Sequence, residues 1–98
     1  MDSEWDAEKN ERNISERGID FAWAVDIFLG PVIERIDTRR DYGEMRWIAI
    51  GAVDGLELVV VYTWRGSRRR IISARRAHDY ERERYRQAFP EIGEDPSG

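Results

Sequence analysis

Residues 56–74 read LELVVVYTWRGSRRRIISA, two runs rich in apolar and β-branched residues on either side of a polar turn at Gly66. The residues from Leu58 to Tyr62 are apolar without interruption, so both faces of an extended chain would be apolar there. A strand of this kind belongs in the middle of a sheet that is covered on both sides. The stretch predicts two antiparallel strands, over 56–64 and 69–74, that form a hairpin.

More strands are expected on the N-terminal side of this hairpin. Residues 45–50 form a third apolar run, which the compact turn Asp54-Gly55 links to the hairpin. Residues 32–36 mix apolar and charged side chains and fit an edge strand, and Trp5 fits a short opening strand. These segments predict an antiparallel β-meander of three to five strands.

Helical patterns flank the strands. Asp6 and Asp20 each precede such a pattern, and an aspartate there accepts hydrogen bonds from the free N–H groups of a first turn. The first pattern ends at Gly18 and the second at Gly30, which proline follows. A third pattern covers 77–89. Two N-terminal helices, a meander and a C-terminal helix make an α+β domain.

The composition fits one domain with one core. We expect that domain over residues 1–89, followed by a flexible acidic tail over 90–98, because 41% hydrophobic content and four tryptophans provide enough apolar surface. The absence of cysteine excludes disulfides and thiolate chemistry, and a single histidine argues against a zinc site of protein ligands alone. The N-terminus is acidic, and no run approaches the ~20 apolar residues of a membrane-spanning helix. We therefore expect a cytoplasmic protein that makes no membrane contact.

Aromatic and branched residues of the predicted elements are assigned to this core. They are Trp5, Phe21, Trp23, Phe28, Trp47, Ile48, Ile50, Val59, Val61 and Ile72. Trp64 stands beside the hairpin turn, and we expect it to be half covered.

Positive charge is concentrated in one part of the chain. Residues 65–86 carry nine arginines and no lysine against three acids, a net charge of +6, whereas the whole chain carries −4. A guanidinium binds phosphate through two parallel hydrogen bonds and stays charged at physiological pH. The cations of 68–76 favour a site for a polyanion, either RNA or an acidic protein segment. Arg82, Arg84 and Arg86, together with Glu81 and Glu83, fit a salt-bridged helix exterior.

Several short motifs occur in an order that resembles the BrnT family, the toxin half of bacterial type II toxin–antitoxin pairs. The resemblance extends from Trp5 to Tyr85. Its motifs read Trp5-Asp6, Lys9, Asn13 and Gly18-Ile19-Asp20-Phe21, then Gly43-Glu44-Met45-Arg46 and Ile50-Gly51, then Val60-Val61-Tyr62-Thr63-Trp64-Arg65-Gly66, Arg70-Ile71-Ile72-Ser73-Ala74-Arg75-Arg76-Ala77 and Glu81-Arg82.

The resemblance implies a RelE-like fold and an endoribonuclease that needs no metal or other cofactor. It also implies a hetero-oligomer with a BrnA-type antitoxin, through which the toxin reaches operator DNA. One departure stands out, because family members usually have Lys-His where this chain has Glu16-Arg17. If that histidine takes part in chemistry, this chain lacks the group, and a catalytically silent partner and co-repressor is the alternative function. If it only caps the helix, Arg17 serves as well.

Metal-free RNA cleavage needs a base for the 2′-hydroxyl, a cation for the phosphate and an acid for the leaving oxygen. Arg75 and Arg70 are the candidates for the cation. They lie five residues apart on one predicted strand, so side-chain alternation places them on opposite faces unless the strand bends. We therefore favour Arg75, at the junction between strand and helix.

Glu44 and His78 are the candidates for proton transfer. Imidazole exchanges protons near neutral pH, but His78 equally fits a helix cap, and Glu44 equally fits an ion pair with Arg46. The candidates for RNA binding are Arg46, Arg68, Arg69, Arg76, Lys9 and Tyr62. For Tyr62 the alternative is core packing. Lys9 and Asn13 share one helix face, which either extends the binding groove or is simply solvated.

Overall fold

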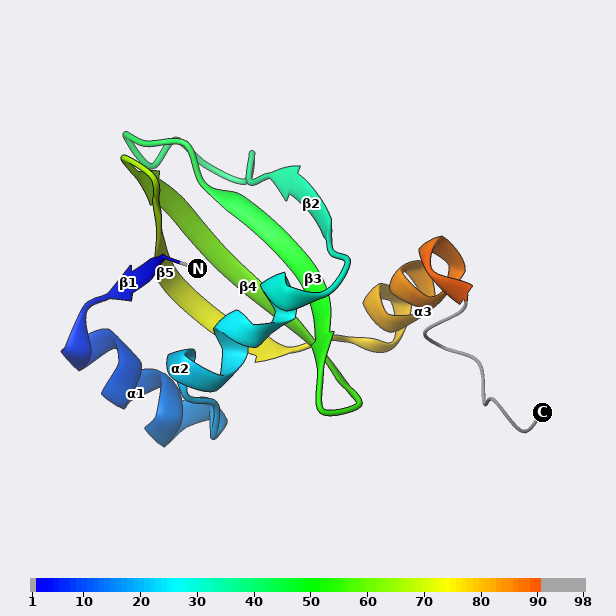
Figure 1. The fold of residues 1–98 in the computed structure, drawn as a ribbon. Coiled ribbons are helices and arrows are strands. Elements are labelled where there is room, and N and C mark those ends of the chain that lie inside the picture. The colour runs from blue at the N-terminus through cyan, green and yellow to red at the C-terminus, as the bar shows by residue number, and fades with distance from the viewer. Residues whose placement is uncertain (1, 91–98) are drawn as a thin grey trace.

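The structure, a computed structural model of the chain, describes residues 2–90, so residues 91–98 of the expected tail lie outside it. Figure 1 shows the arrangement of its elements. In chain order they are β1 (Ser3–Trp5), α1 (Ala7–Arg17), α2 (Phe21–Ala24), the 3-10 helix η1 (Val25–Leu29), β2 (Ile33–Ile36), β3 (Trp47–Val53), β4 (Leu56–Arg65), β5 (Arg68–Arg76) and α3 (Asp79–Ala88). This is an α+β fold, as the sequence predicts.

The five strands form one sheet in the order β1-β5-β4-β3-β2. Strands β2 to β5 are an antiparallel meander, and β4 lies in its centre with residues Leu58–Thr63 buried, both as predicted. The expectation of a wholly antiparallel sheet is wrong for β1, which pairs with β5 in parallel. Residues 6–67 separate these two strands, so no tight turn fixes their relative direction.

One face of the sheet is covered by α1, α2 and η1. Phe21, Ala24 and Ile27 are fully buried there against the side chains of Leu58, Val60 and Tyr62 on β4 and their neighbours. The second predicted helix is not continuous, because a 3-10 turn follows the four residues of α2. That turn sets Ile27 against Gly51 so closely that a Cβ on the glycine would lie 2.7 Å from the Cβ of Ile27.

Asn13 attaches α1 to the sheet. Its side-chain amide donates to the carbonyl oxygen of Ala74 at 2.9 Å and accepts from the Ala74 N–H at 3.3 Å. It also donates to the carbonyl of Ile19 at 2.8 Å. The amide thereby pairs with the edge of β5 beyond the end of β1, as a strand backbone would. This buried role differs from the exposed helix face considered for Asn13.

The other face of the sheet is covered at one end only, by α3. Ala77 and Tyr85 are buried there against Ile48, Ile50 and Val59. Figure 1 shows α3 standing at this end of the sheet, away from β1 and α1. The remainder of this face carries the charged groups described below.

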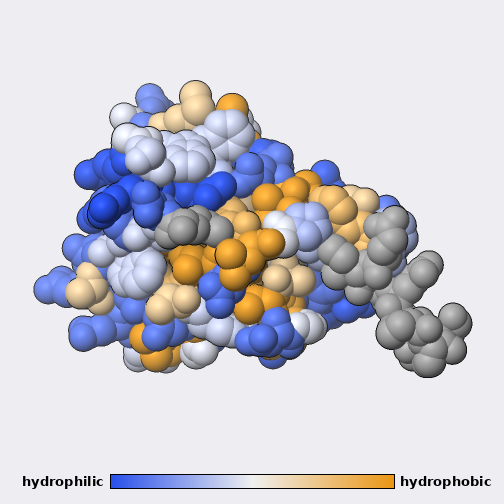
Figure 2. Space-filling model, in the orientation of Figure 1, coloured by the Kyte–Doolittle hydropathy of each residue, from blue (hydrophilic) through white to orange (hydrophobic). Residues whose placement is uncertain are grey.

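The expected core is confirmed in its centre and looser at its margins. Phe21, Ile48, Ile50, Val59 and Val61 are buried, and Trp64 is 44% exposed as expected for a half-covered residue. The residues Trp5, Trp23, Phe28, Trp47 and Ile72 are only partly buried against the two clusters. In the view of Figure 2, apolar residues gather around η1 and β2, where Leu29 and Ile36 are 75% and 42% exposed. Within residues 2–90, no helix is long and apolar enough to cross a membrane.

Candidate functional site

A β-bulge in β5 brings Arg70 and Arg75 to the same face of the sheet. Val61 pairs with Ser73 and Tyr62 pairs with Ile71, so Ile72 has no partner on β4. Strict alternation would separate residues five apart, but one extra residue shifts the later part of the strand by one position. Arg70, Ser73 and Arg75 therefore all lie on the face that α3 only partly covers. The sequence predicts Arg70 and Arg75 on opposite faces unless the strand bends, and this bulge is such an irregularity.

Arg75 lies in a groove of about 260 Å³ on this face, between the sheet and the start of α3. Its polar and charged lining residues come from four elements and one loop: Arg17, Arg35, Arg39, Ser73, Arg75, Tyr80 and Glu81. Ile48, Val59 and Val61 form its apolar floor. Four of the lining side chains are cationic and one is anionic, so the groove suits an anionic ligand.

Glu81 holds Arg75 in a fixed orientation. The Nη1 and Nη2 atoms of Arg75 donate to the two oxygens of the Glu81 carboxylate at 2.7 and 2.8 Å. The carboxylate also accepts the His78 N–H at 2.8 Å and is 4% exposed. The hydrogen bond from Arg75 holds the pKa of Glu81 below its usual value, against the opposing effect of burial. Glu81 is therefore a buried, charged partner of Arg75, and its expected place on a salt-bridged helix exterior is wrong.

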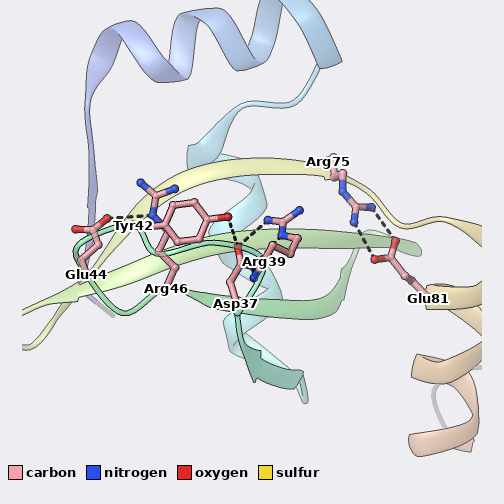
Figure 3. A network of polar contacts seen from close by, with 7 residues as sticks. All are labelled: Asp37, Arg39, Tyr42, Glu44, Arg46, Arg75 and Glu81. Carbon is pink, nitrogen blue, oxygen red and sulfur yellow. Dashed lines mark hydrogen bonds and ion pairs between the residues drawn. The ribbon is translucent and has the colours of Figure 1, made fainter.

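A second arginine in the groove, Arg39, is held in the same way. Its Nε and Nη2 atoms donate to the two oxygens of Asp37 at 2.8 and 2.7 Å. The Asp37 side chain is 1% exposed, whereas that of Arg39 is 64% exposed. The hydrogen bond from Arg39 holds the pKa of Asp37 well below its usual range. Figure 3 shows the Arg75 guanidinium turned toward Glu81 and the Arg39 guanidinium beside Asp37, and both side chains line the groove.

Each of these two guanidinium groups has a free hydrogen-bonding edge. A guanidinium offers five N–H donors in a planar fork. Arg75 uses its end edge for Glu81 and donates the other N–H of Nη1 to the Arg76 carbonyl oxygen at 3.2 Å, which leaves Nε and the second N–H of Nη2. Arg39 uses the side edge for Asp37, which leaves Nη1 and the second N–H of Nη2. Both side chains therefore present two adjacent donors, which matches the spacing of phosphate oxygens.

The other proposed catalytic residues are not among the residues that line this groove, although His78 contacts one of them, Tyr80. Arg70 pairs with Glu4 of β1 at 2.7 Å, and its β4 partner is four residues from that of Arg75, or about 13 Å along the strand. Glu44 pairs with Arg46 at 3.1 Å, the ion pair considered as its alternative role. His78 is the N-cap residue of α3 and stacks on Tyr80, with ring centroids 5.9 Å apart.

The proposed RNA-binding residues are divided between the two faces. Arg69 and Tyr62 lie on the helix-covered face, where the Arg69 guanidinium is 4.0 Å from the ring centroid of Phe28 and 4.7 Å from that of Trp64. Tyr62 is 1% exposed and donates to Glu34 at 2.7 Å, and burial raises the pKa of its phenol to about 12. Arg68 and Arg76 are exposed at the two ends of β5.

Lys9 lies in a second hollow, of about 180 Å³, that adjoins the groove. The two hollows share Arg17 and Ser73 as lining residues, and the second also includes Arg12. None of Lys9, Arg12 and Arg17 has an ion-pair partner within residues 2–90. A row of cations thus runs from the groove onto α1, with the carboxylate of Glu16 among them.

Sequence reasoning missed Arg35, Arg39 and Tyr80 of the groove and the bracing role of Asp37. Arg39 lies in a polar loop, and neither its spacing nor its neighbours mark it. Glu81 belongs to a recognised motif, but its burial depends on the position of α3. The sequence marks Arg17 only as a departure from a family motif, and the structure places its side chain in the lining of the groove.

Two comparisons connect this chain to known proteins. A profile of the family described as "Ribonuclease toxin, BrnT, of type II toxin-antitoxin system" matches residues 5–81. The 1.1 Å crystal structure of the Brucella abortus ribonuclease toxin BrnT superposes with a TM-score of 0.62 at 29% identity, covering 81% of this chain and 99% of that one. No curated protein sequence gave a significant match.

Proposed function

The chain belongs to the BrnT family of ribonuclease toxins of type II toxin–antitoxin systems, and we propose that it cleaves RNA at the groove around Arg75. The observation that carries this proposal is the bidentate clasp of Arg75 by the buried Glu81, which leaves a free pair of donors in a cationic groove. We further propose that cleavage needs no metal, because fixed guanidinium groups supply the positive charge that a metal ion would provide.

In this scheme the 2′-oxygen attacks the neighbouring phosphorus and the 5′-oxygen leaves. A base accepts the 2′-hydroxyl proton, and an acid donates a proton to the leaving oxygen. The products are a 2′,3′-cyclic phosphate and a 5′-hydroxyl. Arg75 stabilises the charge that develops on the phosphoryl oxygens, and it does so without reorganisation because Glu81 already holds it.

Proton transfer is assigned to Tyr80 and His78. Tyr80 lines the groove and is 61% exposed, and His78 stacks on its ring. Both oxygens of Glu81 are engaged by Arg75, so this carboxylate is a poor base. Glu44 lies in the loop between β2 and β3 and is paired with Arg46, so it is not assigned to proton transfer.

The partner proposed for this toxin is a BrnA-type antitoxin in a hetero-oligomer that reaches operator DNA only through the antitoxin. The row of cations from Arg39 to Lys9 supports an RNA strand as substrate and an acidic antitoxin segment as inhibitor. We propose a RelE-like relationship for the fold and the cytoplasm as the place of action.

The test is RNA cleavage by the purified protein in the presence of EDTA. We expect 5′-hydroxyl fragments from the wild type and at least a roughly hundredfold loss of rate for Arg75→Ala, the usual size of a lost transition-state donor. Arg75→Lys keeps a cation beside Glu81 but loses the planar fork, so it should also be strongly impaired. Arg84→Ala is the matched control, since Arg84 is exposed on α3 outside the groove. Full activity of both Arg75 variants would contradict the assignment.

A second candidate function is that of a silent toxin-like partner and co-repressor. It is favoured by one observation: Arg17, not histidine, occupies the position in the groove where the motif usually has Lys-His. Expression in a bacterial host separates the two functions. Growth arrest that the antitoxin relieves excludes the silent partner, whereas normal growth with intact antitoxin binding excludes the nuclease.

A further inference from the structure

The loop of residues 37–46 carries a second arginine held by a buried carboxylate, and we propose that Arg39 binds an RNA phosphate next to the one that is cleaved. This inference rests on the proposed function, because it assigns a subsite to the same groove. It names the substrate as a strand with at least two phosphodiesters, one at Arg75 and one at Arg39.

Asp37 has the properties of a residue that positions Arg39. Besides the two bonds from the guanidinium, its carboxylate accepts the backbone N–H of Arg39 and the Tyr42 hydroxyl, each at 3.1 Å. Its own N–H donates to the carbonyl of Arg46 at 2.8 Å, which ties it to the start of β3. Asp37 is therefore anchored to the sheet and fixes both the backbone and the side chain of Arg39.

Stability alone does not account for this arrangement. Ion pairs that involve an exposed partner contribute little to folding, and burial of a carboxylate opposes it. Here the carboxylate is 1% exposed while the arginine it holds is 64% exposed and directed into the groove. The cost of burying Asp37 is compensated if a fixed, accessible guanidinium is needed for a ligand, as preorganisation predicts.

Glu44 and Arg46 form the next layer of this support. The Arg46 guanidinium lies 4.1 Å from the ring centroid of Tyr42 and is paired with Glu44. Tyr42 in turn donates to Asp37 (Figure 3). The geometry assigns Glu44 and Arg46 an indirect role, in which they hold Tyr42 and Asp37 and thereby Arg39, without contact to the reacting phosphate.

Two arginines held by carboxylates line the same groove, and each could bind one phosphate of an RNA strand. Arg39 and Arg75 both line the groove, and the positive charge of Arg39 acts on Arg75. Their free edges are not engaged by any group within residues 2–90. One bidentate fork takes up both non-bridging oxygens of a phosphodiester, so we assign each of the two forks its own phosphate.

The test compares RNA substrates that differ only in the number of phosphates. One is a dinucleotide with a single phosphodiester, and two are trinucleotides extended on its 5′ or 3′ side, all with mixed bases and one cleavable ribose. We expect Arg39→Ala to lower kcat/KM on one of the trinucleotides by a factor about tenfold or more larger than its effect on the dinucleotide. Asp37→Asn should show the same dependence on substrate length, because Asp37 holds Arg39 in place. A general folding defect would instead reduce the cleavage rates of all three substrates alike. Arg40→Ala removes a neighbouring charge and is the control.

Binding of the same trinucleotides with a 2′-deoxy sugar at the cleavage position separates this inference from the nuclease itself. Loss of the Arg39 contact should lower the slope of log K against log salt by about 0.7. One outcome is that the wild type and Arg39→Ala differ in the salt dependence of binding as expected while the wild type cleaves no RNA. In that case the proposed function fails and the subsite stands. Equal binding and equal length dependence for wild type and Arg39→Ala would overturn the subsite, as would absence of binding to the wild type.

Discussion

The two faces of strand β4 differ in what covers them, although both begin from the same apolar run. On one face, Leu58, Val60 and Tyr62 are sealed under α1, α2 and η1. On the other, Val59 and Val61 are covered by α3 at one end and otherwise form the floor of a cationic groove. The covered face accounts for stability, and the open face provides exposed, oriented charge.

Two arginines on β5, Arg69 and Arg75, illustrate this difference. Arg69 on the covered face lies among three aromatic rings and has no carboxylate partner within residues 2–90. Arg75 on the open face is held by a buried carboxylate and keeps a free edge. The residue type is the same, but its surroundings make one guanidinium a packing element and the other a candidate phosphate site.

The largest expected effect on stability is at Asn13, which fastens α1 to the covered side of the sheet. Asn13→Ala leaves buried backbone groups of Ile19 and Ala74 without partners, so we expect a loss of about 3 kcal/mol in the free energy of unfolding. Urea denaturation measures it, with the exposed Ser15→Ala on the same helix as control. A loss no larger than that of the control would contradict the role of Asn13.

A second prediction concerns the contact between Gly51 and η1. Gly51→Ala should cost about 2 kcal/mol, because the new methyl group would meet Ile27 and Val32 in a packed core. Gly30→Ala is the matched control, since nothing lies within 4 Å of its Cβ position. Thermal unfolding of both variants tests this, and equal melting temperatures would show that the covered face is less tightly packed than described.

On the open face, Glu81→Gln should reveal a pH-dependent contribution. The folded protein lowers the pKa of Glu81 below its ordinary value of 4.5, so the carboxylate contributes stability above that pH and loses it as the pH falls through the folded pKa. The variant should be less stable than the wild type by about 1 kcal/mol at pH 7, and the difference should shrink below about pH 4.5. Denaturation across this range measures it; a constant difference would contradict the ionised pair.

The smallest expected effect distinguishes Arg69 from Arg75. Arg69→Gln removes a cation from the aromatic cluster and should cost roughly 0.5–1 kcal/mol. RNA cleavage should stay within about twofold of the wild type, because Arg69 lies on the face opposite the groove. The same cleavage assay as for Arg75 decides this, and a large loss of activity without loss of stability would place RNA on the covered face.

Much of the fold could be predicted from local patterns. The apolar run of β4, the aspartate caps of α1 and α2 and the Asp54-Gly55 turn each determine structure through nearby residues. The parallel addition of β1 and the break between α2 and η1 could not be predicted, because both depend on partners far away in the chain. The tightness of the Gly51 contact is a tertiary property of the same kind.

The candidate site was predicted only in part for a related reason. Arg75 stands out by composition, but the bulge at Ile72, the burial of Glu81 and the return of loop 37–46 to the groove arise from the assembled sheet. Side-chain alternation alone would have separated Arg70 from Arg75. The family resemblance supplied the activity, whereas the structure supplied the partners that orient the arginines.

The proposed function requires RNA to bind the open face with a phosphate at Arg75. The most direct measurement is NMR mapping of backbone and arginine side-chain signals during titration with a trinucleotide that carries a 2′-deoxy sugar at the cleavage position. We predict shifts at the Arg75 and Arg39 guanidinium groups and along the floor at Val59 and Val61, with the signals of Arg69 unmoved. Shifts confined to Arg69, Trp64 and the covered face would contradict the account.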